Sequence, residues 1–343
     1  MVGTMTVREV GATELGALAR SLREFSGTTR KHTIKDIVRI FDEGGINPSF
    51  GEDAAILEHG DECLLLAADG IWDRLMKADP EWSGYCAVLV NVHDIYAMGG
   101  RPIGMVDVFS SSSDEVTKNV LKGMRAGVDK LGVPIVGGHT HPDTPYSALS
   151  VAILGSVKKD CIIYSSRAKP GDDIVLAIDL DGRVHPSSDL NWDSTSFKNP
   201  EVVRYQAESM VELGERNLLT AGKDVSNPGV IGTLGMILEL SGVGAEVELS
   251  RILKPPQLGY VQWLRVYPGM GFIVTCDKNN TRSVLDTFRA HGLSAVSIGS
   301  IVPGTRLDVT DTEERAMIFD FTKDNITGLK VLRGVKNDKD INK

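Results

Sequence analysis

Four aspartates stand beside small residues in settings where a lone carboxylate is costly to bury: Asp53, Asp69, Asp94 and Asp224. Each alone is more often structural than catalytic, but such acids occur in both halves of the chain. Clustered carboxylates repel one another unless hard cations lie between them. Mg²⁺ held by a few carboxylates together with phosphate oxygens is the usual arrangement in nucleotide chemistry. The four acids therefore predict a magnesium and nucleotide site.

Asp94 lies in a segment that predicts a helix over Trp82–Met98. Gly99-Gly100 would end this helix, and the Arg-Pro pair that follows would prevent its restart. Asn91 stands three residues before Asp94, a spacing that puts both side chains on one helical face. For a single acid of this kind, the simpler alternative is an amphipathic helix whose aspartate faces water.

Two further stretches carry groups suited to phosphate. Gly137-Gly138 follow a short apolar strand, Pro134–Val136, and would let backbone N–H groups approach phosphate oxygens closely. The polar stretch Ser26–Thr33 contains Arg30-Lys31-His32, either a solvated helix entry or a mobile cationic loop that closes over phosphates. The chain has no G-x-x-x-x-G-K-[ST] and no G-x-G-x-x-G after a strand, so a nucleotide must bind without a P-loop or a dinucleotide fold.

Composition narrows the class of protein. A chain of 343 residues suggests about two domains, and 42% hydrophobic with 24% charged residues is ordinary for a soluble globular protein. The net charge of -9 argues against a nucleic-acid partner. No apolar run reaches the ~18 residues of a membrane span, and Met1–Thr13 lacks a signal pattern, so a cytoplasmic protein without a membrane partner is expected. The cysteines form no C-x-x-C pair and are expected to be small core residues: Cys63, Cys86, Cys161 and Cys276.

Strands alternate with helices, so two mixed α/β domains are expected, at residues 1–165 and 166–335, followed by a flexible tail at 336–343. Gly182–Pro200 is expected to be a long polar loop, and substrate specificity is expected there and in Lys254–Met270. The predicted helices are Ala12–Phe25, a helix around Ile34–Phe41, Trp82–Met98, Asp114–Leu131, Glu201–Leu219, Val230–Leu240 and Thr281–His291. Gly51–Leu57 is predicted to be a turn leading into a short strand. The other predicted strands are Cys63–Ala68, Pro102–Ser110, Pro134–Val136, Ser147–Val157, Ile174–Ile178, Ala245–Leu249, Gly271–Cys276, Ala295–Val302 and Arg306–Val309.

Five motifs follow one another in the order G-E-D-A-A-I, A-A-D-G, N-x-x-D-I-Y-A-M-G-G-R-P, G-G-H-T and D-V-S-N-P-G. Their order resembles that of the aminoimidazole ribonucleotide synthetase-like superfamily, which includes selenophosphate synthetase, thiamine-monophosphate kinase and a hydrogenase maturation protein. The resemblance runs from Gly51 to about Leu249. It implies an N-terminal domain whose strands complete a barrel across a homodimer, and a C-terminal α/β sandwich. It also implies ATP in a cleft, with Mg²⁺ between carboxylates and phosphates.

The same resemblance assigns roles motif by motif. Asp53, Asp94 and Asp224 match metal ligands, and Asn91 would orient the same site. Lys31 falls where selenophosphate synthetases carry a lysine that closes over phosphate, so Lys31 and Asp94 are the implied catalytic pair. The implied nucleotide contacts are Asp69, a turn formed by Gly137, Gly138 and His139, and Thr140.

The implied activity is ATP- and Mg²⁺-dependent activation of a small molecule through a phosphorylated intermediate. The G-G-H-T motif favours the selenophosphate synthetase branch, but Ser26–Thr33 lacks the cysteine or selenocysteine of those enzymes. Asn227 replaces an aspartate of the thiamine-monophosphate kinase motif. The aggregate pattern is most similar to the methanogenesis marker protein 2 group, which implies cofactor or metalloenzyme maturation in a methanogen. Two alternatives stay open: a nucleotide sensor or scaffold without turnover, and an activity like that of selenophosphate synthetase or thiamine-monophosphate kinase.

Overall fold

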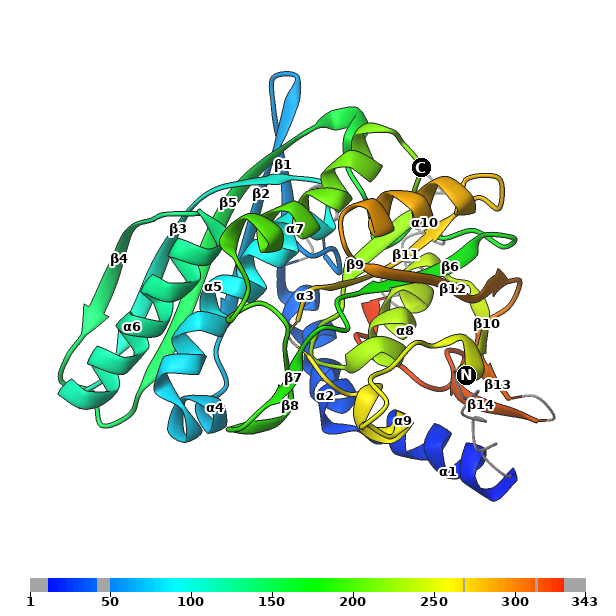
Figure 1. Cartoon of the computed structure of the whole chain (residues 1–343), viewed down its shortest axis with the longest axis horizontal. Helices are drawn as coiled ribbons and strands as arrows, with labels where there is room; N and C mark the ends of the chain where they lie inside the picture. The colour runs from blue at the N-terminus through cyan, green and yellow to red at the C-terminus, as the bar shows by residue number, and fades with distance from the viewer. Residues whose placement is uncertain (1–11, 42–49, 268, 312–313, 330–343) are drawn as a thin grey trace, which may run out of the picture.

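The computed structural model describes residues 12–41, 50–267, 269–311 and 314–329. Within these ranges, two mixed sheets of five and seven strands lie side by side, each packed against helices (Figure 1). The first sheet is built from residues 55–158 and the second from residues 173–320. A hairpin of two short strands, β7 (Arg183–His185) and β8 (Ser188–Asp193), follows the first strand of the second sheet in the chain. The mixed α/β architecture expected from the sequence is therefore confirmed.

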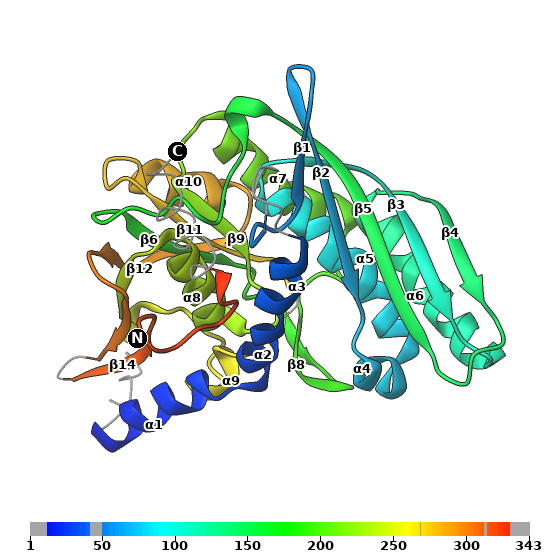
Figure 2. The same cartoon turned by 180° about the vertical axis from the view of Figure 1, so that it is seen from behind.

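Within the described residues, helices cover one face of the first sheet and leave the other uncovered. Its order, β1-β2-β5-β3-β4, places β5 (Ala148–Lys158) in the middle, where residues alternate between buried and accessible, as expected for a sheet with one covered face. Helices α5 (Pro80–Ala97) and α6 (Asp114–Leu131) cover the buried face, and in Figure 2 the strands lie in front of both helices. The other strands are β1 (Ala55–His59), β2 (Glu62–Gly70), β3 (Arg101–Ser110) and β4 (Ile135–His141).

The uncovered face of this sheet carries apolar side chains that water can reach. Five of them are between 44 and 72% exposed: Leu57, Leu66, Val106, Val108 and Val136. Exposed apolar patches of this kind usually mark an interaction surface. The predicted barrel across a homodimer would need such a face. The structure contains a single chain, so the barrel stays a prediction.

Helices α5 and α6 pack closely because glycines lie at their contact. Asp79 caps the first turn of α5 through a side-chain hydrogen bond of 2.9 Å. A β-carbon on Gly84 would lie 2.1 Å from the carbonyl oxygen of Val120, and one on Gly123 would lie 1.8 Å from that of Glu81. Neither contact is possible for a larger residue without displacement of the helix backbone. The helix predicted at Trp82–Met98 is confirmed as Pro80–Ala97, and it is followed by Gly99, whose φ is +74°.

The second sheet is covered on both faces. Its order is β14-β13-β10-β12-β6-β11-β9. The residues of β6 (Asp173–Ile178) after the first are all buried, because they alternate between two hydrophobic clusters. Helices α7 (Pro200–Glu215) and α10 (Thr281–Ala290) belong to one layer, and α1 (Ala12–Arg23) and α8 (Gly229–Ser241) to the other. The remaining strands are β9 (Ala221–Asp224), β10 (Gly244–Glu248), β11 (Gly271–Cys276), β12 (Ser294–Val302), β13 (Arg306–Thr310) and β14 (Arg315–Asp320).

The short helical elements lie mostly around the junction of the two halves. They are α2 (Ser26–Thr29), η1 (Arg30–Thr33), α3 (Ile34–Phe41), α4 (Asp73–Ala78), η2 (Lys159–Cys161), η3 (Leu249–Arg251) and α9 (Tyr260–Trp263). The predicted polar stretch Ser26–Thr33 is thus helical. It is held because Gly27 packs directly on Asn227, where a β-carbon would lie 2.4 Å from the carbonyl oxygen.

Two other predictions were wrong in their local structure. Gly137-Gly138 do not form a turn, because Ile135–His141 is a continuous strand paired in parallel with β3. Gly182–Pro200 is not an open polar loop. It contains the β7–β8 hairpin and the buried residues Asn191, Trp192 and Asp193. Strands β9 and β14 were not predicted, and the expected tail at 336–343 lies outside the described residues.

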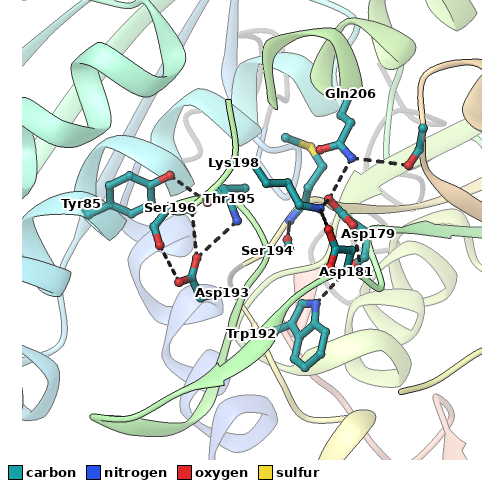
Figure 3. A network of polar contacts seen from close by, with 12 residues as sticks. Tyr85, Asp179, Asp181, Trp192, Asp193, Ser194, Thr195, Ser196, Lys198 and Gln206 are labelled. Carbon is teal, nitrogen blue, oxygen red and sulfur yellow. Dashed lines mark hydrogen bonds and ion pairs between the residues drawn. The ribbon is translucent and has the colours of Figure 1, made fainter. Parts of the chain in front are cut away.

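The segment after β8 connects the two halves through polar contacts (Figure 3). The Tyr85 hydroxyl, from α5, bonds to that of Thr195 at 2.8 Å, and Asp193 accepts bonds from the Ser196 hydroxyl and two backbone N–H groups. Further along, the ammonium group of Lys198 contacts the buried Asp179. These bonds explain how a polar sequence becomes a fixed wall between the sheets. No described helix is long and apolar enough to span a membrane.

Candidate magnesium and nucleotide site

A cavity of about 630 Å³ opens between the two sheets and is lined by residues from both. We call it the acidic pocket. The end of β2, one side of α5 and the end of β9 form its base, and η1 contributes cations. The β7–β8 hairpin forms a further wall through Ser187, Ser188, Asp189, Leu190 and Asn191.

Three of the predicted acids meet at the base of the acidic pocket. One carboxylate oxygen each of Asp53, Asp94 and Asp224 lies within 4.8 Å of the others. Asp94 comes from the last turn of α5, and Asp224 is the last residue of β9. Asp53 precedes β1, and its neighbour Glu52 fixes that turn by accepting bonds from the backbone N–H of Ser165 and the hydroxyl of Ser166.

The electrostatics of these acids suit a cation. Burial raises the pKa of Asp94 well above its usual value, and the nearby charges of Asp69 and Asp224 raise it further. Burial also raises the pKa of Asp224, against the opposing effect of Lys223. Asp53 Oδ2 and Asp224 Oδ1 are buried without a hydrogen-bond partner. Unsatisfied buried oxygens are costly, and carboxylate oxygens are the ligands that Mg²⁺ prefers, so the residues fit the predicted metal.

A lysine that the sequence analysis did not single out lies in the same cluster. Lys223 is buried, and its ammonium group forms an ion pair with Asp53 Oδ1. Burial lowers the pKa of Lys223 to about 8, although Asp224 acts in the opposite direction. The cluster thus already contains one positive charge from the chain itself.

Asp69 and the cations of η1 line the upper part of the acidic pocket. Asp69 keeps access to solvent through the cavity, yet burial raises its pKa, opposed by Lys31 and Arg30. The guanidinium group of Arg30 lies over the Trp72 ring, 4.6 Å from its centroid. Of the basic triplet, Arg30 and Lys31 line the cavity, whereas His32 does not.

Asn91 does not reach the acidic pocket. The residues of α5 that line it are Cys86, Val90, His93 and Asp94, which follow one helical stripe. Asn91 is fully buried on a different stripe, and its side-chain amide donates to the carbonyl of Ala87, four residues earlier, at 2.8 Å. The spacing of three residues was therefore a poor guide to which side chains share the site.

The Gly137–Thr140 segment is also absent from this pocket within one chain. Gly138 pairs with Asp107 of β3, which pairs with Val151 of β5, which pairs with Asp69. At about 4.8 Å per strand, Gly138 lies roughly 14 Å from Asp69 across the sheet. Gly137, His139 and Thr140 belong to the same accessible edge strand.

Several residues that line the pocket were not among the site residues predicted from the sequence. His93 is buried, its pKa is lowered to about 4 by burial, and its Nε2 has no partner. Asn227 donates to the Tyr267 hydroxyl at 3.1 Å while its own carbonyl oxygen is unpartnered. Trp72 and Tyr267 come from segments without a motif. Only His93 and Asn227, inside two of the quoted motifs, could have been found by their position.

Two family models match the chain. "AIR synthase related protein, N-terminal domain" covers residues 51–157, and the corresponding C-terminal domain covers residues 169–312. The chain belongs to the AIR synthase-related family. Members of this superfamily are ATP-dependent enzymes.

Among curated proteins, the chain is 44% identical over 324 residues to the uncharacterized protein MJ0640 of Methanocaldococcus jannaschii, with 92% of this chain and 99% of the relative covered. It is 39% identical over 278 residues to the uncharacterized protein sll0787 of a Synechocystis species, with 81% and 86% covered. It is 26% identical to a selenide, water dikinase of Carboxydothermus hydrogenoformans, with 76% and 77% covered.

Solved structures share the fold at low sequence identity. A PurL of Thermotoga maritima complexed with ATP has a TM-score of 0.74 and 18% identity over 90% of this chain, which spans about half (51%) of that PurL. The structure titled "AaThiL complexed with AMPPCP and TMP" has a TM-score of 0.62 and 18% identity, with 92% of this chain and 99% of that chain covered. Identities this low establish the fold alone.

Proposed function

We propose that this protein is an ATP- and Mg²⁺-dependent phosphotransferase or synthetase that activates a small molecule through a phosphorylated intermediate. The observation that carries the proposal is the cluster of Asp53, Asp94 and Asp224, with two unpartnered buried oxygens, at the base of a cavity large enough for small ligands. The family assignment supports ATP as the phosphoryl donor.

The proposed roles follow from charge and position. Asp53, Asp94 and Asp224 would hold Mg²⁺, which neutralises phosphate charge and stabilises the transition state of phosphoryl transfer when bound. Lys31, half-buried in the cavity wall, would contact the transferred phosphoryl group. Asp94 is proposed as catalytic because it contacts the metal at the centre of the cluster. Asp69 would contact the nucleotide.

A homodimer would give Gly137–Thr140 a role that one chain does not. The uncovered face of the first sheet exposes Leu66, Val106 and Val108, and β4 lies at its edge beside them. We propose that a second copy packs on this face and that the barrel predicted from the resemblance forms there. Gly137, Gly138, His139 and Thr140 would then contact a nucleotide held between two copies.

The β7–β8 hairpin is the proposed wall for the phosphoryl acceptor. It supplies Ser187, Ser188 and Asp189 to the lining of the cavity, and Tyr267 lies beside it, where its carbonyl accepts a bond from Asn191. The proposal that the protein acts in methanogen cofactor or metalloenzyme maturation rests on the sequence pattern and on the Methanocaldococcus relative. The Synechocystis relative implies that the chemistry is wider than methanogenesis.

The metal and nucleotide site can be tested by calorimetry. Asp94→Ala and Asp53→Ala should each abolish Mg²⁺-dependent ATP binding while circular dichroism reports an intact fold. Asp181→Ala is the control, because the side chain of this acid is 84% exposed and does not line the cavity, and its ATP affinity should stay within about threefold of wild type. Unchanged ATP affinity in both cluster variants would refute the site.

Turnover separates the enzyme from the alternative of a nucleotide sensor. Asn227, in the position where a thiamine-monophosphate kinase carries an aspartate, is the observation that favours the sensor. The protein incubated with ATP, Mg²⁺ and a cell extract should yield a phosphorylated small molecule that mass spectrometry can identify. If only slow single-turnover ATP hydrolysis occurs, with no metabolite that stimulates it, the sensor is the better description.

A further inference from the structure

Lys223 occupies a place in the acidic cluster where a cation is required. Its side chain is only 8% exposed and that of its partner Asp53 only 3%. The three clustered carboxylates would repel one another in the absence of a positive charge. The Lys223 ammonium group, paired with Asp53 Oδ1, is the cation that the chain itself supplies at this point.

The position of Lys223 is fixed by the strand that also carries Asp224. In β9, Lys223 pairs with Ile273 and Asp224 with Phe272 of β11, so the two residues are held by consecutive positions of one ladder. Successive residues of a strand point to opposite faces, yet both side chains line the acidic pocket. The lysine side chain is long enough for its ammonium group to reach Asp53 from the position of Lys223 in β9.

The pairing in the cluster is incomplete. Lys223 satisfies one oxygen of Asp53, whereas Asp53 Oδ2 and Asp224 Oδ1 remain buried without partners. The nearby acid Glu52 is held by other partners. Its two carboxylate oxygens accept bonds from the backbone N–H of Ser165 and from the hydroxyl of Ser166. Lys223 therefore partly neutralises the cluster and leaves ligand oxygens available on its open side.

We propose that Lys223 takes the place of one divalent cation between Asp53 and the other two acids. Without nucleotide, the cluster binds free divalent metal weakly, because its strongest cation position is already filled. The metal would bind together with the nucleotide. Its ligands would be the remaining carboxylate oxygens of the cluster and oxygens of the phosphates. The protein then needs one divalent ion fewer than a cluster of the same three acids without the lysine. This inference rests on the proposed magnesium and nucleotide function.

Lys223→Met tests the inference because it removes the charge and keeps most of the volume. Mn²⁺ is the probe, and its binding to the full chain is followed by electron paramagnetic resonance, with and without a non-hydrolysable ATP analogue. Nucleotide-free Mn²⁺ should bind Lys223→Met at least tenfold more tightly than wild type, and one more Mn²⁺ per chain should bind in the presence of the analogue. Mn²⁺ should also raise the melting temperature of the variant more than that of wild type.

Two further variants keep the test decisive. Arg74→Met removes an exposed positive charge from the lining of the same cavity, and its Mn²⁺ affinity should stay within about threefold of wild type. Lys223→Gln is neutral but can still donate a hydrogen bond to Asp53, so it serves if Lys223→Met does not fold.

The outcomes separate this inference from the function on which it rests. Equal Mn²⁺ affinity and stoichiometry in wild type and the folded Lys223 variants would overturn the role of Lys223 while leaving the metal site in place. A tenfold gain in Arg74→Met as well would also overturn it, because the effect would then be general to positive charge in the cavity. Absence of Mn²⁺ binding in every protein, even with the ATP analogue, would overturn the metal site and this inference together.

Discussion

Asp179 and Asp181 share one lysine, and they show how burial decides the value of an ion pair. Both carboxylates lie near the ammonium group of Lys198, but the Asp179 side chain is 4% exposed and that of Asp181 is 84% exposed. Asp179 also accepts a bond of 2.8 Å from Gln206, as the close-up in Figure 3 shows. The two acids stand two positions apart in the sequence, which does not distinguish them.

We expect Asp179→Ala to lower the free energy of unfolding by about 3–5 kcal/mol, because it leaves the largely buried Lys198 without its closest partner. Asp181→Ala is the control and should change stability by less than about 0.5 kcal/mol, since an exposed ion pair is worth little. Urea unfolding followed by circular dichroism measures both. Similar losses in the two variants would contradict the assigned difference in burial.

The four cysteines are predicted to be unreactive in the native protein. All are buried, burial raises the pKa of Cys276 to about 11, and it raises that of the pocket-lining Cys86 well above its usual value. At pH 8 the thiols are protonated and lack the thiolate needed for attack. Ellman's reagent should therefore modify less than one thiol per native chain and four per unfolded chain. Rapid modification of Cys86 in the native protein would instead reveal a reactive cysteine in the pocket.

At the scale of elements, the periodicity of apolar residues predicted helices and strands well, whereas the glycines of the motifs predicted a turn wrongly. The apolar patterns of α5 and α6 and the unbroken apolar run of β6 predicted their type within a few residues, because burial of those side chains decides local structure. Gly137-Gly138 were expected in a turn and lie in β4, since pairing with β3 overrides the flexibility of glycine. β9 was missed because Ala-Gly-Lys-Asp has no strand pattern and is held by its neighbour β11.

The contact of α5 with α6 gives a test at this scale. Gly123→Ala should destabilise the protein by about 1–3 kcal/mol, because the added methyl group would meet the backbone of α5 at the Glu81 carbonyl. Gly16→Ala in α1 is the matched control: its methyl group meets nothing within 4 Å, so it should stabilise the protein by up to about 1 kcal/mol. Thermal unfolding of both variants measures the difference. A stabilising Gly123→Ala would show that the two helices are less closely packed.

At the scale of the whole molecule, the first sheet has one covered and one uncovered face. A face that exposes Leu66 on β2 and Val106 and Val108 on β3 is expected to be covered by another protein surface. The homodimer proposed above would cover it and bring the β4 edge of one copy toward the site of the other. One chain alone leaves the nucleotide segment Gly137–Thr140 about three strands from Asp69.

We expect wild-type protein to be dimeric and Val106→Lys to be monomeric in size-exclusion chromatography with light scattering. A charged side chain in the centre of the exposed face would be buried without a partner in the dimer. Val202→Lys is the control, because Val202 is similarly exposed (46%) but lies on α7, away from this face. A wild-type monomer, or a Val106→Lys dimer, would contradict the proposed interface.

The sequence by itself determined the order of the motifs, the alternation of strands and helices and a set of four candidate acids, from which the family resemblance selected Asp53, Asp94 and Asp224. These features depend on residue type, on spacing and on burial along a single element. Only the tertiary structure decided which residues share the site. It excluded Asn91 from the pocket and placed Lys223 beside Asp53, although the two are separated by 170 positions in the chain. It also turned Gly182–Pro200 into a wall of the pocket. The physical reason is that these contacts depend on how two sheets pack together, which no local pattern encodes.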